Sequence, residues 1–183
     1  MRMTTRGIAV AVSVVALGVL APTASDAHSA CTIDGTSGRD RLTGTHGRDV
    51  ICARAGRDLI QAEAGNDLIY GGRGSDQIGA AGGSDRVFGG RGNDRIDGEP
   101  GQNVIFGGPG ADRISAGPQK SRLYGQAGRD FIYATGGSQL VSGGPGNDRC
   151  LDTRFGTPGD VLRGGEGRCE GRSKTVAVAG RNQ

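Results

Sequence analysis

The sequence predicts an all-β protein, a right-handed parallel β-roll or β-helix solenoid with two parallel sheets. Glycine accounts for 37 of 183 residues, and the chain has no Trp, so it cannot build a wide core of large side chains. A nine-residue pattern also repeats thirteen times without a gap, from Gly35 to Leu151. This repeat distinguishes the chain from disordered glycine-rich sequences and from collagen, in which glycine occupies every third position.

Each unit combines a glycine turn with a short strand. The unit Gly89–Asp97 reads Gly-Gly-Arg-Gly-Asn-Asp-Arg-Ile-Asp. Glycines at positions one, two and four permit a tight turn and a close approach of neighbouring turns. Position eight is aliphatic in twelve units and is Cys150 in the last. Strand alternation sends this side chain inward and positions seven and nine outward. Each unit is one turn plus one strand, or about half a coil, so two units complete one coil of eighteen residues.

Position six is aspartate in ten of the thirteen units, and the units stack along two edges. Odd-numbered units form what we call the continuous edge, with an aspartate at every turn: Asp40, Asp58, Asp76, Asp94, Asp112, Asp130 and Asp148. Even-numbered units form the interrupted edge, which has three aspartates followed by neutral residues: Asp49, Asp67, Asp85, Asn103, Ser121 and Gln139.

These stacked carboxylates are candidate metal ligands. Parallel strands repeat at about 4.8 Å, and like charges at that distance repel by about 1 kcal/mol in water, and by more at a lower dielectric constant. A cation between turns removes the repulsion, and Ca²⁺ accepts flexible shells of carboxylate and carbonyl oxygens better than Mg²⁺ does. One ion for each successive pair gives up to eight Ca²⁺, six on the continuous edge and two on the interrupted edge. The alternative is that each aspartate only closes its own turn.

The pattern G-G-x-G-x-D-x-U-x resembles the hemolysin-type calcium-binding repeat of the repeats-in-toxin (RTX) family. The resemblance covers residues 35–151 and implies a calcium-bound parallel β-roll. The core is small, and glycine loses much conformational entropy on folding. We therefore expect a largely disordered metal-free chain that folds on binding calcium.

The first residues are typical of an export signal. Arg2 and Arg6 precede an apolar stretch and a small-residue segment, which predicts a signal peptide of the Sec type over residues 1–27, with cleavage after Ala24 or Ala30 as alternatives. We expect a secreted, extracellular protein, associated with the cell wall as one option, without a transmembrane anchor after cleavage. Residues 28–34 then form an N-terminal cap, 35–151 the repeats, and 152–183 a C-terminal cap and tail, with a partial unit displaced by three residues at 159–162.

The four cysteines lie near the two ends of the repeat region. Three pairings are open. We favour Cys31–Cys52 and Cys150–Cys169, because the two pairs bracket opposite ends of a long rod and an exported chain permits disulfides. A zinc site is the rival, but no C-x-x-C spacing or histidine cluster supports it.

Two outward surfaces stand out. Position nine of the even units places Tyr70, Phe88, Phe106 and Tyr124 in one row, either as a candidate interaction face or as a ladder that stabilises the sheet. Position seven of the odd units carries arginines, which we interpret as a solvated face: Arg41, Arg95, Arg113 and Arg149.

The residues indicate a binding protein rather than an enzyme. The net charge is +3, and +2 once residues 1–27 with two Arg and one Asp are removed, which gives no strong attraction to nucleic acid. No catalytic residues are identified. We expect a calcium-binding structural or interaction module with a cell-wall or protein partner. The alternatives are an accessory repeat protein of an extracellular enzyme or toxin system and a cell-surface adhesion module.

Overall fold

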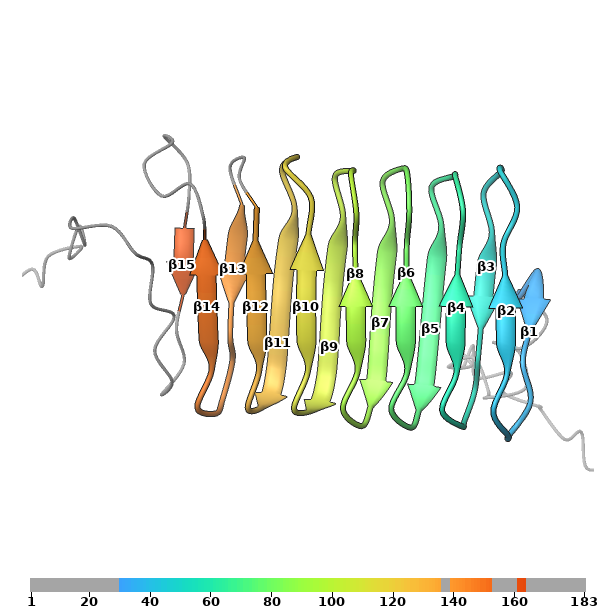
Figure 1. Cartoon of the computed structure of the whole chain (residues 1–183), viewed down its shortest axis with the longest axis horizontal. Helices are drawn as coiled ribbons and strands as arrows, with labels where there is room; N and C mark the ends of the chain where they lie inside the picture. Colours follow the sequence, from blue (N-terminus) through green and yellow to red (C-terminus); the bar gives the residue numbers. More distant parts are fainter. Residues whose placement is uncertain (1–29, 136–138, 153–160, 164–183) are drawn as a thin grey trace, which may run out of the picture.

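The computed structural model describes residues 30–135, 139–152 and 161–163, which form an elongated β-solenoid (Figure 1). The strands alternate along the rod between two parallel sheets. The eight-stranded sheet contains β1 (Ile33–Asp34), β3 (Val50–Cys52), β5 (Leu68–Arg73), β7 (Arg86–Arg91), β9 (Val104–Gly110), β11 (Arg122–Gly128), β13 (Leu140–Ser142) and β15 (Val161–Arg163). The seven-stranded sheet contains β2 (Arg41–Thr43), β4 (Leu59–Gln61), β6 (Gln77–Gly79), β8 (Arg95–Asp97), β10 (Arg113–Ala116), β12 (Phe131–Ala134) and β14 (Arg149–Asp152). The predicted fold class is confirmed.

The strand register confirms that two nonapeptides make one coil. Within each sheet, partners lie eighteen residues apart, as in Ile69↔Val87 and Ile114↔Ile132. The last pair differs, because Val141 pairs with Leu162, an offset of 21 residues. The sequence places the displaced partial unit at the same point, and β15 is its strand. The predicted signal peptide, residues 1–27, lies outside the described residues, as does most of the C-terminal cap and tail.

The core is one narrow column of small and aliphatic side chains. Position eight supplies residues such as Ile69 and Ile96, each at most 1 % exposed. Position one also points inward, because it lies two residues beyond position eight on the same face of the strand. There the chain has glycine or a buried alanine: Ala53, Ala62, Ala80, Ala116 and Ala134. By the same alternation, position six points inward, which places the aspartates inside the coil.

The glycines at position four allow successive turns to stack in direct contact. Gly92 has φ +130°, and a Cβ atom built on it would lie 1.7 Å from the carbonyl oxygen of Gly74. At Gly128 the corresponding distance, to the carbonyl oxygen of Gly110, is 1.5 Å, with φ +144°. No side chain fits at Gly92 or Gly128, which explains why twelve of the thirteen units have glycine at position four; the exception is Gln119.

One predicted disulfide is present at the N-terminal end. Cys31 is joined to Cys52, which links the segment before β1 to the neighbouring strand β3. Cys150 is buried in the core, and its predicted partner Cys169 lies outside the described residues, so the second pairing stays a prediction. In the described part of the chain, no helix is long and apolar enough to cross a membrane.

The stacking of turns generates a test with a matched control. Gly92→Ala should lower the free energy of unfolding by about 3 kcal/mol or more, because the methyl group meets a backbone carbonyl and the positive φ strains an L-residue. Gly82→Ala, at an open turn position with nothing within 4 Å of the new Cβ, should change stability little. Thermal unfolding in saturating calcium measures both, and equal stability of the two variants would contradict the stacking argument.

Candidate metal centre

Nine of the ten position-six aspartates are buried inside the two edges of the solenoid, and the first, Asp40, is half-buried. Asp58 and Asp94 are each 2 % exposed, and Asp112 and Asp130 are each 1 % exposed. Each precedes a strand whose inward side chain is two residues later, so the carboxylate continues the inward face of that strand. In Figure 1 the continuous edge runs along the bottom of the rod, where the even-numbered strands begin. A row of buried carboxylates is costly unless each is bonded or paired with a cation.

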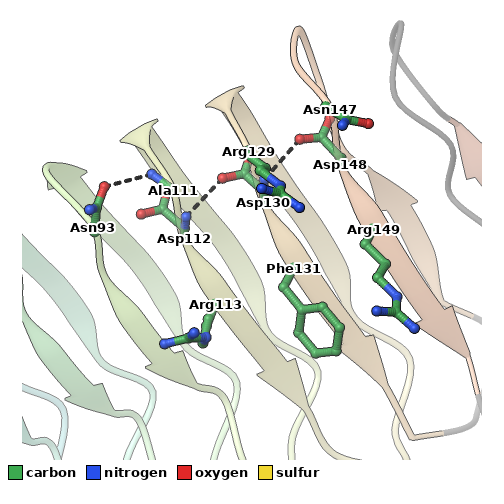
Figure 2. Close-up of a pocket in the computed structure, with 10 residues that line it drawn as sticks. All are labelled: Asn93, Ala111, Asp112, Arg113, Arg129, Asp130, Phe131, Asn147, Asp148 and Arg149. Atoms are coloured by element: carbon green, nitrogen blue, oxygen red, sulfur yellow. Dashed lines mark hydrogen bonds between the residues drawn. The ribbon is translucent and has the colours of Figure 1, made fainter.

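One carboxylate oxygen of each aspartate joins neighbouring coils. The Oδ1 atom accepts a hydrogen bond from the backbone N–H of the position-six residue eighteen positions earlier, as when Asp94 donates to Asp112 at 2.8 Å. Asp112 donates to Asp130 in the same way at 2.9 Å (Figure 2). Eight aspartates accept this bond: Asp58, Asp67, Asp76, Asp85, Asp94, Asp112, Asp130 and Asp148. The alternative in which each aspartate merely closes its own turn therefore does not describe these eight.

The other oxygen of the same eight aspartates is left over. Their Oδ2 atoms are buried and have no hydrogen-bond partner among the described residues. Six of these atoms lie on the continuous edge and two, from Asp67 and Asp85, on the interrupted edge. A buried, unpartnered carboxylate oxygen is expensive, and a bound cation is a physical reason for its survival. These atoms fit a hard, oxygen-seeking ion such as Ca²⁺.

Backbone carbonyls stand close to these oxygens. A Cβ atom built on Gly89 would lie 2.6 Å from Asp94 Oδ2 and 2.5 Å from the carbonyl oxygen of Gly107 on the next coil. At Gly125 the corresponding distances are 2.3 Å to Asp130 Oδ2 and 2.6 Å to Gly143 O. Carboxylate and carbonyl oxygens therefore converge beside the position-one glycines. Three turns with aspartate have alanine at position one instead, and we predict weaker metal binding there: Ala53, Ala62 and Ala80.

The first aspartate of each edge is capped by the protein itself. Thr36 donates its backbone N–H at 2.6 Å and its hydroxyl at 3.0 Å to Asp40 Oδ2. Thr45 does the same for Asp49 Oδ2, at 2.7 Å and 3.0 Å. These two aspartates begin their ladders without an unpartnered oxygen. The sequence signal for these caps is threonine at position two of the first two units, and the sequence analysis missed it.

Burial raises the pKa of the central aspartates in the metal-free chain. The pKa of Asp85, Asp94 and Asp130 rises to about 6 from an ordinary value of 3.8, chiefly because burial disfavours the charged form. Asp112 reaches a pKa of about 7, because burial is joined by the charges of Asp94 and Asp130 on the neighbouring coils. The N–H bond donated by the preceding coil lowers each pKa without cancelling the shift.

The interrupted edge replaces carboxylates with side chains that carry their own hydrogen atoms. Asn103 keeps the ladder, because its Oδ1 accepts the N–H of Asp85 at 2.9 Å, while its Nδ2 donates to the carbonyl of Gly98. Ser121 Oγ donates to Gly101 O at 3.1 Å, and Gln139 Nε2 donates to Gly117 O at 2.8 Å. A neutral donor thus bonds a turn carbonyl on this half of the edge.

The candidate ligands are therefore carboxylates combined with backbone oxygens. No group of three or more His, Cys, Asp or Glu side chains converges in the described part of the chain. A zinc centre needs about four nitrogen or sulfur ligands in a tetrahedron, whereas calcium accepts six to eight oxygens, including carbonyls. The donor set on the two edges matches calcium.

The predicted aromatic row is a continuous stack on the outward face of the eight-stranded sheet. The ring centroids of Tyr70, Phe88, Phe106 and Tyr124 are 5.2, 5.0 and 4.9 Å apart in order, with planes within 10° of parallel. Tyr70, at one end, is 41 % exposed. Because the rings cover one another, the geometry favours a ladder that stabilises the sheet, and a role as an interaction face stays a prediction.

Comparison with known proteins agrees with this geometry. Four copies of the RTX calcium-binding nonapeptide repeat match residues 32–60, 47–78, 79–114 and 115–150. A search of curated proteins finds no match. The four matches cover nearly all of the ordered coils, and their repeat length is the one that sets the eighteen-residue register. The chain belongs to the family of proteins with RTX calcium-binding nonapeptide repeats.

Proposed function

We propose that this chain is an exported calcium-binding rod that folds around up to eight Ca²⁺ ions and acts as a structural or interaction module rather than as an enzyme. The proposed number of Ca²⁺ ions rests on the buried Oδ2 atoms that have no hydrogen-bond partner in the described part of the chain, six on the continuous edge and two on the interrupted edge. Calcium would supply charge neutralisation between successive coils. The aspartates would hold it with backbone carbonyls of the glycine turns.

Export by a signal peptide is part of the same proposal. The Cys31–Cys52 disulfide supports it, because disulfides persist in oxidising compartments outside the cytoplasm. Calcium is also abundant outside cells, where weak sites remain filled. In this view the chain leaves the cell unfolded and acquires its shape on meeting calcium.

Calcium removal and restoration test the proposal directly. In a calcium-free buffer the far-ultraviolet circular dichroism should be that of a largely disordered chain, because the buried carboxylates repel and the aliphatic core is narrow. Millimolar calcium should produce a strand spectrum, and titration calorimetry should count about eight ions. An identical strand spectrum in both buffers would refute the coupling of folding to calcium.

The variant Asp94→Asn separates the ladder from the metal. Asn103 shows that asparagine keeps the interstrand bond through Oδ1, so the turn should remain intact. We expect the calcium count to fall by about two, because Asp94 belongs to two successive pairs, and we expect the calcium-free chain to become easier to fold because one buried charge is gone. The reverse change, Asn103→Asp, should add an ion beside Asp85 and destabilise the calcium-free chain. Unchanged ion counts in both variants would remove these residues from the metal sites.

The pH should act in opposite directions with and without calcium. The pKa values of about 6 to 7 at Asp85, Asp94, Asp112 and Asp130 lie above the unfolded value of about 3.9, so the folded chain binds extra protons between these values. In calcium-free buffer this stabilisation is complete below about pH 4 and is lost as the pH rises through about 6 to 7, so the strand signal should grow from pH 8 to pH 5.

In saturating calcium the trend reverses, because protons compete with the ion for the same carboxylates. Thermal unfolding at pH 5 and pH 8, in both buffers, measures the two trends. A calcium-free chain that loses structure on acidification would contradict the assignment.

A further inference from the structure

The arginines of the repeat region are concentrated on one side of the rod. Of the fourteen basic side chains within residues 35–151, ten belong to the odd-numbered units of the continuous edge, and all ten are arginine. They are Arg39, Arg41, Arg54, Arg57, Arg73, Arg91, Arg95, Arg113, Arg129 and Arg149. Outside the buried aspartate ladder, the acidic residue of those units is Asp97. The sequence predicts a solvated face here, but the structure adds a concave surface to it.

Four of these arginines line a concave surface over the outward face of β8, β10, β12 and β14, which we call the arginine groove: Arg95, Arg113, Arg129 and Arg149. A cavity of about 420 Å³ is lined by Arg95, Arg113, Phe131 and Tyr133, among other residues. A second cavity of about 710 Å³ shares Arg113 and Phe131 with the first and includes Arg129 and Arg149 (Figure 2). It is also lined by three aspartates of the continuous edge, Asp112, Asp130 and Asp148. The two cavities therefore adjoin at Arg113 and Phe131.

The arginines of the groove form no salt bridge with the residues that the structure describes. Among the described residues the one salt bridge joins Arg54 to Asp34, at the other end of the rod. Strand register sets Arg95 directly beside Arg113, and Arg149 beside Phe131, whose ring centroid lies 5.9 Å from the Arg149 guanidinium carbon. Exposed like charges on neighbouring strands destabilise a sheet slightly, and an anionic occupant would reverse that effect. The planar guanidinium group of arginine can also bind a carboxylate through two parallel hydrogen bonds.

The remaining lining residues narrow the class of anion. Asp97 and Glu99 line the same cavity, together with the hydroxyl groups of Ser115, Tyr133 and Thr135. These carboxylates would repel a polymer with a charge on every backbone unit, such as a nucleic acid, but they accept hydrogen bonds from sugar hydroxyls. The Arg149 guanidinium already covers one face of Phe131, which leaves less of the ring for base stacking.

The spacing suits an alternating pattern of charge. Arg113 and Arg149 lie on β10 and β14, two strand spacings apart, which is about 10 Å along the sheet. Between them, the Phe131 ring offers an apolar surface to a sugar ring. An extended glycan with a carboxylate on every second sugar would present its charges at a comparable interval, with hydroxyl groups between them.

We propose that the arginine groove binds an acidic polysaccharide, and that it does so in the calcium-loaded state. This inference rests on the proposed function, because six Ca²⁺ ions along the continuous edge would more than neutralise its seven aspartates. The filled edge would then add to the positive potential of the arginines instead of opposing it. The rod would thus acquire its glycan-binding surface when it folds on binding calcium.

Titration calorimetry with short hyaluronan chains in millimolar calcium tests the proposal on the full exported chain. Hyaluronan carries a carboxylate on alternate sugars, and neutral dextran serves as the uncharged comparison. The wild type should bind hyaluronan and not dextran, and Arg113→Gln with Arg149→Gln should weaken binding at least tenfold. The matched control is Arg86→Gln with Arg122→Gln, which removes two exposed position-seven arginines from the opposite sheet and should change the affinity less than twofold.

The circular dichroism and calcium count of every variant are measured in parallel. If the wild-type chain fails to fold or to bind calcium, the proposed function is refuted. If the wild-type chain folds with eight ions but does not bind hyaluronan, the groove proposal alone is refuted. The same holds if both double variants bind hyaluronan equally well. Tighter binding of a single-stranded oligonucleotide than of hyaluronan, lost in the Arg113 and Arg149 variant, would also overturn the glycan assignment.

Discussion

The structure depends on the different partners of the two carboxylate oxygens in eight buried aspartates. Oδ1 bonds the backbone N–H of the coil before it, at 2.8 to 2.9 Å, and this bond holds the coils in register. Oδ2 remains inside the protein without a hydrogen-bond partner in the described chain. One oxygen of the side chain therefore stabilises the contact between coils, while the burial of the other is electrostatically unfavourable. In the proposed function, a divalent cation would offset this cost by bridging the coils, and folding would then be coupled to metal binding.

The two edges show what happens when that requirement is relaxed. Asn103, Ser121 and Gln139 occupy the aspartate position but provide an N–H or O–H of their own to a turn carbonyl. They need no cation, because the hydrogen atom that they carry performs the same task. At the N-terminal end, Thr36 and Thr45 cap the first carboxylate of each edge. From Asp58 onward, the continuous edge of the described chain has an unpartnered carboxylate oxygen at every turn, whereas half of the interrupted edge forms its own hydrogen bonds.

The same asymmetry organises the outer surface. Odd-numbered units place their arginines on and beside the edge with the complete carboxylate ladder, while the outward face of the eight-stranded sheet carries the aromatic stack from Tyr70 to Tyr124. In a solenoid each coil repeats the position of the previous one, so any preference at one position becomes a line along the rod. The buried charge and the exposed charge of the continuous edge thus lie close together, and in the proposed calcium-loaded state the ions inside would change the potential outside.

The sequence by itself determined the fold class, the eighteen-residue coil, the inward aliphatic column and the displaced strand at Val161, because a strict period fixes which residues stack. It left the cysteine pairing open, and the structure shows Cys31 joined to Cys52. Only the tertiary structure decided which atoms each carboxylate oxygen contacts. The sequence set Asp94 and Asp112 next to each other, but the bond from the N–H of one to the Oδ1 of the other depends on the exact stagger of two coils. The donors on the interrupted edge and the hollow around Arg113 likewise depend on side-chain directions in three dimensions, which a linear period does not contain.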